Sequence, residues 1–165
     1  YQHNLSMSKK DFNHSDQTVP FADTIMVRDS CLCLHVRRAA RTIARRFDDA
    51  FRPLDLTSGQ YSLLMSLNRP YPPHMKDVAD LLAMDRTTLT ANLKPLERRG
   101  LVEIAPDPKD KRGRLITLTR DGMALLARAF PIWQETQQQL ENQVADEDPK
   151  QLLAALINLS HDPDD

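Results

Sequence analysis

The 165-residue sequence predicts a mainly helical (α+β) protein in which a single β-hairpin interrupts a series of helices. Two observations predict this class. The chain holds only 4 Gly and is rich in Leu, Ala, Arg and Gln, which favour helices. Two short apolar segments, at 101–105 and 114–118, flank a loop of Pro, Asp, Lys, Arg and Gly, the pattern of a hairpin. With 41% apolar residues the chain can bury one core, with an appended helical arm.

The first two helices follow from apolar periodicity and from caps. Apolar residues recur at three- and four-residue steps from about Thr24 to Phe51, which predicts one long helix that Pro53 ends. A second helix begins after Thr57, a good N-cap, because Gln60 stands where a capping box needs Glu or Gln. The first 20 residues are polar, so we expect a disordered tail that includes a cloning remnant before Met7.

Two short helices then follow in close succession. The pattern predicts helices over 75–82 and 86–99, joined by about three residues, with Asp85 as the cap of the latter. This spacing is typical of a helix-turn-helix unit. Together with the hairpin formed by 101–105 and 114–118, it predicts a winged helix-turn-helix. Further helices are expected over 121–145 and 149–159.

The helix 86–99 has the side chains that a DNA-reading helix needs. Leu89, Leu93 and Leu96 share its inner side, and the outer side carries polar and basic residues. Thr and Ala can contact thymine methyl groups, Asn can pair with adenine, and Arg or Lys can reach guanine or phosphate. The candidate DNA contacts on this helix are Arg86, Thr87, Thr90, Ala91, Asn92 and Lys94. The alternative is a solvated helix face, which the adjacent basic hairpin disfavours.

The hairpin loop predicts a DNA-contacting wing. Arg112 or Arg114 would reach the minor groove, where negative potential is concentrated, and Lys109 and Lys111 would attract phosphate. Asp110 could fix the loop tip by accepting hydrogen bonds.

Charge is segregated along the chain, although the net charge is only -1. Residues 85–120 hold nine Lys and Arg against five acidic residues, whereas residues 121–165 hold two against nine. Only the basic segment is therefore expected to face double-stranded DNA.

Two segments give the sequence a resemblance to a known family. Leu96-Glu97-Arg98-Arg99-Gly100-Leu101-Val102, and later Asp110-Lys111-Arg112-Gly113-Arg114-Leu115-Ile116-Thr117-Leu118-Thr119, resemble the MarR family of transcription regulators. The resemblance covers about residues 25–160. It implies a homodimeric repressor on a pseudo-palindromic operator, with a N-terminal dimerisation helix in 21–53, a DNA-binding domain in 54–120 and C-terminal dimerisation helices in 121–165.

The resemblance also implies roles for individual residues. Thr87, Thr88, Thr90, Asn92 and Lys94 would contact the major groove, and Asp110 and Arg112 would form a wing pair. The family's effectors are often aromatic acids that bind between the dimer arm and the winged helix. In this sequence that implies His35, Arg38, Tyr61 and Met65 as a ligand site.

Two cysteines raise an alternative means of regulation. Cys31 and Cys33 lie among arginines early in the first helix, where a thiolate is favoured, and Cys33 resembles the reactive cysteine of the family's organic-hydroperoxide sensors. A thiol-based peroxide switch is thus an alternative to a ligand, beside plain core packing. Cys31 and His35 have helical spacing for metal ligands, but no third ligand is apparent, so no metal is expected.

Other classes of function have little support. The chain lacks a phosphate-binding Gly-rich loop and a nucleophile elbow, so we expect no enzyme and no cofactor. It has no apolar segment that predicts membrane insertion or a signal peptide, and two cysteines make no disulfide framework, so we expect a cytoplasmic protein. A winged-helix protein-interaction module without DNA binding is the rival class.

Overall fold

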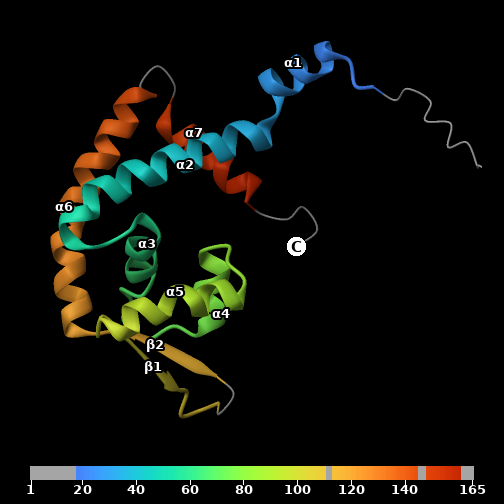
Figure 1. Ribbon diagram of the computed structural model, residues 1–165. Coiled ribbons are helices and arrows are strands. Elements are labelled where there is room, and N and C mark those ends of the chain that lie inside the picture. The colour runs from blue at the N-terminus through green and yellow to red at the C-terminus, as the bar shows by residue number, and fades with distance from the viewer. Residues whose placement is uncertain (1–17, 111–112, 145–147, 161–165) are drawn as a thin grey trace, which may run out of the picture. The chain divides into compact units, whose positions relative to one another are not determined.

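The computed structural model describes residues 18–110, 113–144 and 148–160. The chain divides into two compact units, one ending at Ala39 and the other beginning at Ala40. The elements, labelled in Figure 1, are α1 (Phe21–Ser30), α2 (Leu32–Phe51), the 3-10 helix η1 (Arg52–Leu54), α3 (Ser58–Ser66), α4 (Met75–Leu81), α5 (Arg86–Arg98), β1 (Val102–Pro106), β2 (Arg114–Leu118), α6 (Arg120–Gln143) and α7 (Pro149–Leu159). The predicted fold class is confirmed.

The first unit corrects one prediction. The single helix expected from Thr24 to Phe51 is two helices, because Cys31 adopts an extended conformation between α1 and α2. Asp29 and Ser30 are poor helix formers, and the Ser30 hydroxyl donates a hydrogen bond to the Met26 carbonyl. No residue of α1 is buried, so no packing within the described chain holds the two helices in line.

The capping box predicted for α3 forms, and a further cap lies at the start of α6. The Gln60 amide donates to the Thr57 hydroxyl, and the Thr57 amide donates to the Gln60 side chain, which completes the capping box of α3. The Thr119 hydroxyl accepts the Gly122 amide at the start of α6 and donates to the Gly100 carbonyl. Thr119 thereby joins α6 to the turn that follows α5.

The wing is a two-stranded antiparallel sheet. Val102 pairs with Leu118 at its base and Pro106 with Arg114 near the loop. Val102 and Ile116 are buried, so one face of the hairpin closes the core. The segment before α4 adds to this sheet, since the Ile116 amide donates to the Pro73 carbonyl and His74 forms a bridge with Leu115.

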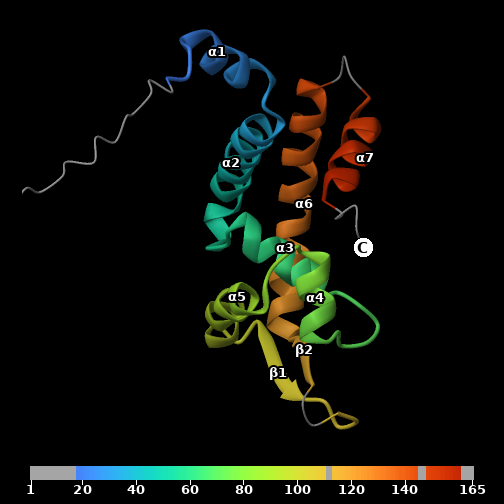
Figure 2. The same cartoon turned by 90° about the vertical axis from the view of Figure 1, so that its right-hand side faces the viewer.

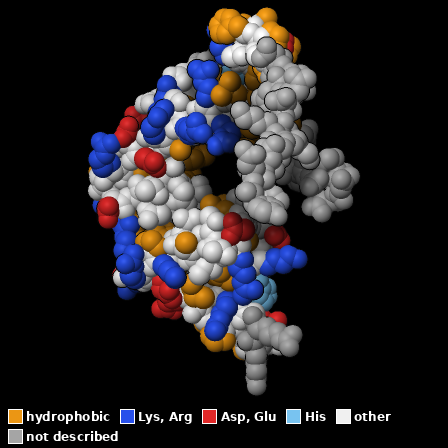
Figure 3. Space-filling view, turned by 45° about the vertical axis from the view of Figure 1, so that its right-hand side comes forward, with side chains coloured by type: hydrophobic (Ala, Val, Ile, Leu, Met, Phe, Trp, Pro, Cys, Tyr) orange, Lys and Arg blue, Asp and Glu red, His pale blue; other side chains and the backbone are white. Residues whose placement is uncertain are grey.

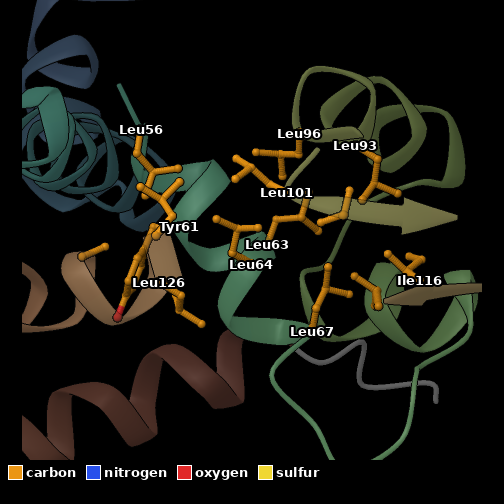
Figure 4. Packing of buried hydrophobic residues seen from close by; sticks show 14 of the residues in the cluster. Leu56, Tyr61, Leu63, Leu64, Leu67, Leu93, Leu96, Leu101, Ile116 and Leu126 are labelled. Atoms are coloured by element: carbon orange, nitrogen blue, oxygen red, sulfur yellow. The ribbon is translucent and has the colours of Figure 1, made fainter. Parts of the chain in front are cut away.

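The core of the second unit lies between α3, α5, the hairpin and the first half of α6 (Figure 4). Leu64, Leu89, Leu93, Leu96 and Ile116 are fully buried there. A row of stacked rings continues the core along α6, with Phe51 and Tyr61 centroids 4.8 Å apart and Tyr61 and Trp133 centroids 6.5 Å apart. Because α5 and the hairpin both bury residues in this core, the core holds them in a fixed arrangement relative to each other.

Figures 1 and 2 show α6 running away from the hairpin, with α7 following its far end. Leu125, Leu126 and Ala129 are buried, so part of the apolar stripe expected to serve the dimer arm belongs to the core of the chain itself. The apolar residues of α7 differ, because none of them is buried. No helix in the described ranges has the length and apolar character needed to cross a membrane.

Candidate nucleic-acid interface

The helix α5 is held at its start by Asp85. The Asp85 carboxylate accepts hydrogen bonds from the Thr88 amide (2.8 Å) and the Thr88 hydroxyl (2.6 Å). The Thr88 hydroxyl, followed by the Thr88 amide, holds the pKa of Asp85 below its ordinary value. The ionised cap also stabilises the positive end of the helix dipole. The first turn, which carries Arg86 and Thr87, is therefore ordered before any DNA arrives.

The outward face of α5 is exposed at every predicted contact. Those residues are Arg86, Thr87, Thr88, Thr90, Ala91, Asn92 and Lys94. Some of their side chains already have partners: the Thr88 hydroxyl caps the helix, and the Thr90 hydroxyl donates to the Arg86 carbonyl. The Asn92 amide lies 3.8 Å from the Met84 sulfur in the turn before α5. The side chains on this face that are best placed to contact DNA are thus those of Arg86, Thr87 and Lys94.

The far end of α5 is tied to the segment between α2 and α3. The Arg99 guanidinium donates to the Asp55 carbonyl at 2.5 Å and to the Leu54 carbonyl at 3.4 Å. Asp55 has a positive φ of 50°, which turns its carbonyl at the end of η1. Sequence reasoning missed this contact, because nothing local to Arg99 indicates a partner 44 residues away.

The wing loop is ordered at its base by Asp107, a residue that sequence reasoning also missed. Its carboxylate accepts the Lys109 amide at 2.8 Å, and its own amide donates to the Gly113 carbonyl at 3.1 Å. The signal in the sequence was the side-chain turn that Asp favours two residues before its partner. Asp110 contributes through its backbone, since its carbonyl accepts the Gly113 amide. Arg114 is exposed, whereas Lys111 and Arg112 lie outside the described residues.

An open pocket of about 560 Å³ lies between α4, the start of α5 and the wing. Three cations, Lys76, Arg86 and Arg114, line it together with His74. Acidic residues line it too: Asp77, Asp80 and Asp110. Figure 3 shows Lys and Arg side chains gathered in the lower part of that view, with acidic side chains beside them. The pocket therefore brings the first turn of α5 and the wing to one surface.

The predicted ligand residues fall in different units. His35 and Arg38 belong to the first unit and are exposed, with His35 Nε2 lying 3.0 Å from the Arg28 carbonyl. Tyr61 and Met65 belong to the second, where Met65 packs against the core. Tyr61 is buried, and its hydroxyl has no hydrogen-bond partner among the described residues. Burial raises the pKa of Tyr61.

The two cysteines are free thiols. Cys31 is half-buried and its sulfur accepts the Leu34 amide at 3.5 Å, whereas Cys33 is exposed. Within the described ranges, no three His, Cys, Asp or Glu side chains gather to hold a metal ion.

Comparisons with known proteins agree with this geometry. A family model described as MarR family matches residues 54–113. The organic hydroperoxide resistance transcriptional regulator of Bacillus subtilis is 32% identical over 134 residues, which cover 81% of this chain and 90% of that protein.

Solved structures give the same result. The M. tuberculosis transcriptional regulator MosR in complex with DNA is 35% identical, with a TM-score of 0.72, over 79% of this chain and 93% of that one. The repressor CouR, bound to a 23-mer DNA duplex, is 26% identical with a TM-score of 0.74, over 82% and 96%.

Helix α5, its capped first turn and the adjacent hairpin define the class of winged-helix DNA-binding transcription regulators. The relatives are regulators and not enzymes, as predicted for this chain. The chain belongs to the MarR family.

Proposed function

We propose that the chain is a repressor that binds a pseudo-palindromic operator as a homodimer and responds to a small molecule. The observation that carries the DNA contact is the exposed face of α5, which presents Arg86, Thr87 and Lys94, with Arg86 lining the same pocket as Arg114 of the wing. The helix would enter the major groove, and the wing would follow the backbone to the minor groove. Among the relatives, CouR is a repressor bound to DNA. Because the proposed target of this chain is genomic DNA, the protein would act in the cytoplasm.

The test is a titration of the protein against the DNA upstream of its own gene and against unrelated DNA. Lys94→Ala should weaken binding and lower the magnitude of the salt slope by about two, because one phosphate contact is lost from each subunit of the dimer. Lys150→Ala is the matched control, since it removes the same charge from exposed α7. Equal affinity for both DNAs, unaffected by Lys94→Ala, would instead support an interaction module.

The homodimer is supported by the apolar residues that the chain leaves uncovered. On α7, Leu152, Leu153 and Leu156 expose between 42% and 59% of their surface. Exposed apolar residues of this number on one short helix are typical of an interface. A dimer would also place two α5 helices on the two halves of an operator, which a single helix is too short to select.

Regulation by an aromatic or anionic ligand is favoured by Tyr61. A buried hydroxyl without a partner costs free energy, which a ligand's polar group would recover. Adding salicylate to the operator complex should release DNA from the wild type, and Tyr61→Phe should need more of it.

A thiol switch through Cys33 or Cys31 remains the alternative. It is favoured by the exposed Cys33 thiol and by the similarity to the hydroperoxide resistance regulator of Bacillus subtilis. Treating the protein with organic peroxide, then alkylating and weighing it, should show loss of free thiol together with loss of operator binding. Full alkylation after peroxide would exclude the switch.

A further inference from the structure

We propose that His74 and Asp107 form a contact that sets the orientation of the wing relative to the helix-turn-helix, and thereby determines selectivity at the DNA positions that the wing reaches. The inference rests on the proposed DNA binding and adds two positioning residues to it. Neither residue is expected to touch the DNA itself.

The contact joins two elements that the rest of the backbone connects only indirectly. His74 is the N-cap residue of α4, the first helix of the helix-turn-helix. Asp107 follows the last residue of β1, where the wing loop begins. The His74 Nε2 atom lies 3.7 Å from Asp107 Oδ2, close enough for the polar ring to interact electrostatically with the carboxylate.

The burial of Asp107 strengthens this interaction. The Asp107 side chain is only 9% exposed, whereas the His74 side chain is 48% exposed. A carboxylate taken out of water needs partners for both oxygens. The Lys109 amide donates to Oδ1, and the His74 imidazole faces Oδ2. Losing His74 would remove the partner that faces Oδ2 of a nearly buried carboxylate.

His74 also touches the strand that leaves the loop. A Cβ atom built on Gly113 would lie 3.5 Å from His74 Nδ1 and 3.3 Å from the Asp107 Cβ atom. The imidazole ring is therefore in contact range of both ends of the loop, at the point where the Asp107 amide donates to the Gly113 carbonyl. Since Arg114 follows Gly113, the direction of Arg114 depends on this point.

Backbone bonds link the segment before α4 to β2, so the fold of the wing does not depend on the His74 side chain alone. The Pro73 carbonyl accepts the Ile116 amide, and His74 bridges to Leu115. These bonds hold the first residues of β2 whatever side chain occupies position 74. The His74 side chain then adds the contact nearest the loop, so its removal should loosen the wing and leave the fold intact.

The test compares four substitutions of the full-length protein on operator DNA. His74→Ala removes the ring. His74→Ser also removes it but supplies a better helix cap for α4, so it separates loss of the wing contact from loss of the cap. His74→Gln keeps a side-chain N–H that can face the carboxylate. Lys150→Ala, on exposed α7, is the control for loss of a cation away from this surface.

Two footprints are read for each variant. Hydroxyl radicals report protection of the minor groove, where the wing would lie, and dimethyl sulfate reports protection of guanine in the major groove. We expect His74→Ala and His74→Ser to lose minor-groove protection and to bind roughly tenfold more weakly, while major-groove protection stays. His74→Gln should restore most of both, and Lys150→Ala should keep both patterns. Unchanged minor-groove protection in His74→Ser would overturn the proposal.

A second measurement needs no DNA. The Lys109 and Gly113 amides, which are bonded at the base of the loop, should exchange with deuterium faster in His74→Ser than in the wild type. Asp107→Asn should accelerate them similarly, and the double variant should be no faster than Asp107→Asn alone. Failure of the wild type to select an operator would contradict the proposed function, whereas unchanged exchange would overturn the role of His74.

Discussion

Gly122 shows how a single residue is constrained by its neighbours. It is the third residue of α6, where Ala would ordinarily stabilise the helix by about 1 kcal/mol. A Cβ atom there would lie 2.1 Å from the Leu101 carbonyl oxygen and 2.8 Å from the Leu118 Cδ1 atom. The close approach of α6 to the end of α5 and to β2 therefore requires glycine.

We expect Gly122→Ala to lower the free energy of unfolding by about 1–3 kcal/mol, because the backbone atom it meets cannot give way cheaply. Urea denaturation measures this. Gly59→Ala is the matched control, since nothing lies within 4 Å of a Cβ atom there, and it should leave stability unchanged or raise it. A stabilising Gly122→Ala would contradict the packing described.

The buried environment of Tyr61 leads to a prediction about how stability depends on pH. Burial raises the pKa of its phenol in the folded state. A group of this kind contributes its stability in full below the unfolded-state pKa of about 10, and that contribution is lost as pH rises beyond it. The stability of the wild type should therefore fall with increasing alkalinity above about pH 10.

Tyr61→Phe should remove most of this alkaline decline and leave neutral stability unchanged or slightly higher, because the lost hydroxyl has no partner among the described residues. Urea denaturation at neutral and alkaline pH measures both effects. Tyr71→Phe is the control, since Tyr71 is 83% exposed. A large loss of neutral stability in Tyr61→Phe would show that the hydroxyl has a partner.

At the scale of an element, α5 depends on its cap. The pKa of Asp85 is lowered in the folded state, so its contribution is present above the unfolded-state pKa of about 4 and is lost as pH falls toward the folded-state value. Asp85→Ala should reduce stability at neutral pH and flatten its dependence on acid. It should also weaken operator binding, because the first turn of α5 would fray.

The measurement is urea denaturation at neutral and acidic pH, paired with operator titration. Asp85→Asn is the informative companion, since Asn is a good cap but carries no charge. It should retain most of the neutral stability and lose the acid dependence. If Asp85→Ala and the wild type have the same acid profile, the carboxylate does not cap α5 in solution.

At the scale of the molecule, the exposed apolar side of α7 should decide assembly. Leu153→Glu places a charge where a partner would bury an apolar side chain, at a cost of about 1.5–3 kcal/mol or more. We expect the dimer to dissociate at least roughly tenfold more readily, as measured by sedimentation at several concentrations. Gln151→Glu adds the same charge on the same helix and should have little effect. No buried residue of α7 is disturbed, so the fold should persist.

Many features of this protein are local and were therefore predictable. The capping box of Thr57 and Gln60, the cap at Asp85 and the inner leucines of α5 involve residues within a few positions of one another. The same reasoning failed at Cys31, where weak local signals and the absence of buried residues in α1 divide a helix that the apolar period alone would continue.

The sequence by itself thus determined the order of helices and hairpin, the exposed polar face of α5 and the class of protein, because helical period, caps and basic loops act over short stretches of chain. Only the tertiary structure decided which contacts support that face. His74 with Asp107, Arg99 with Asp55, and Gly122 against Leu101 join residues distant in sequence. Such pairs depend on how the elements pack, and neither partner carries a local signal for the other.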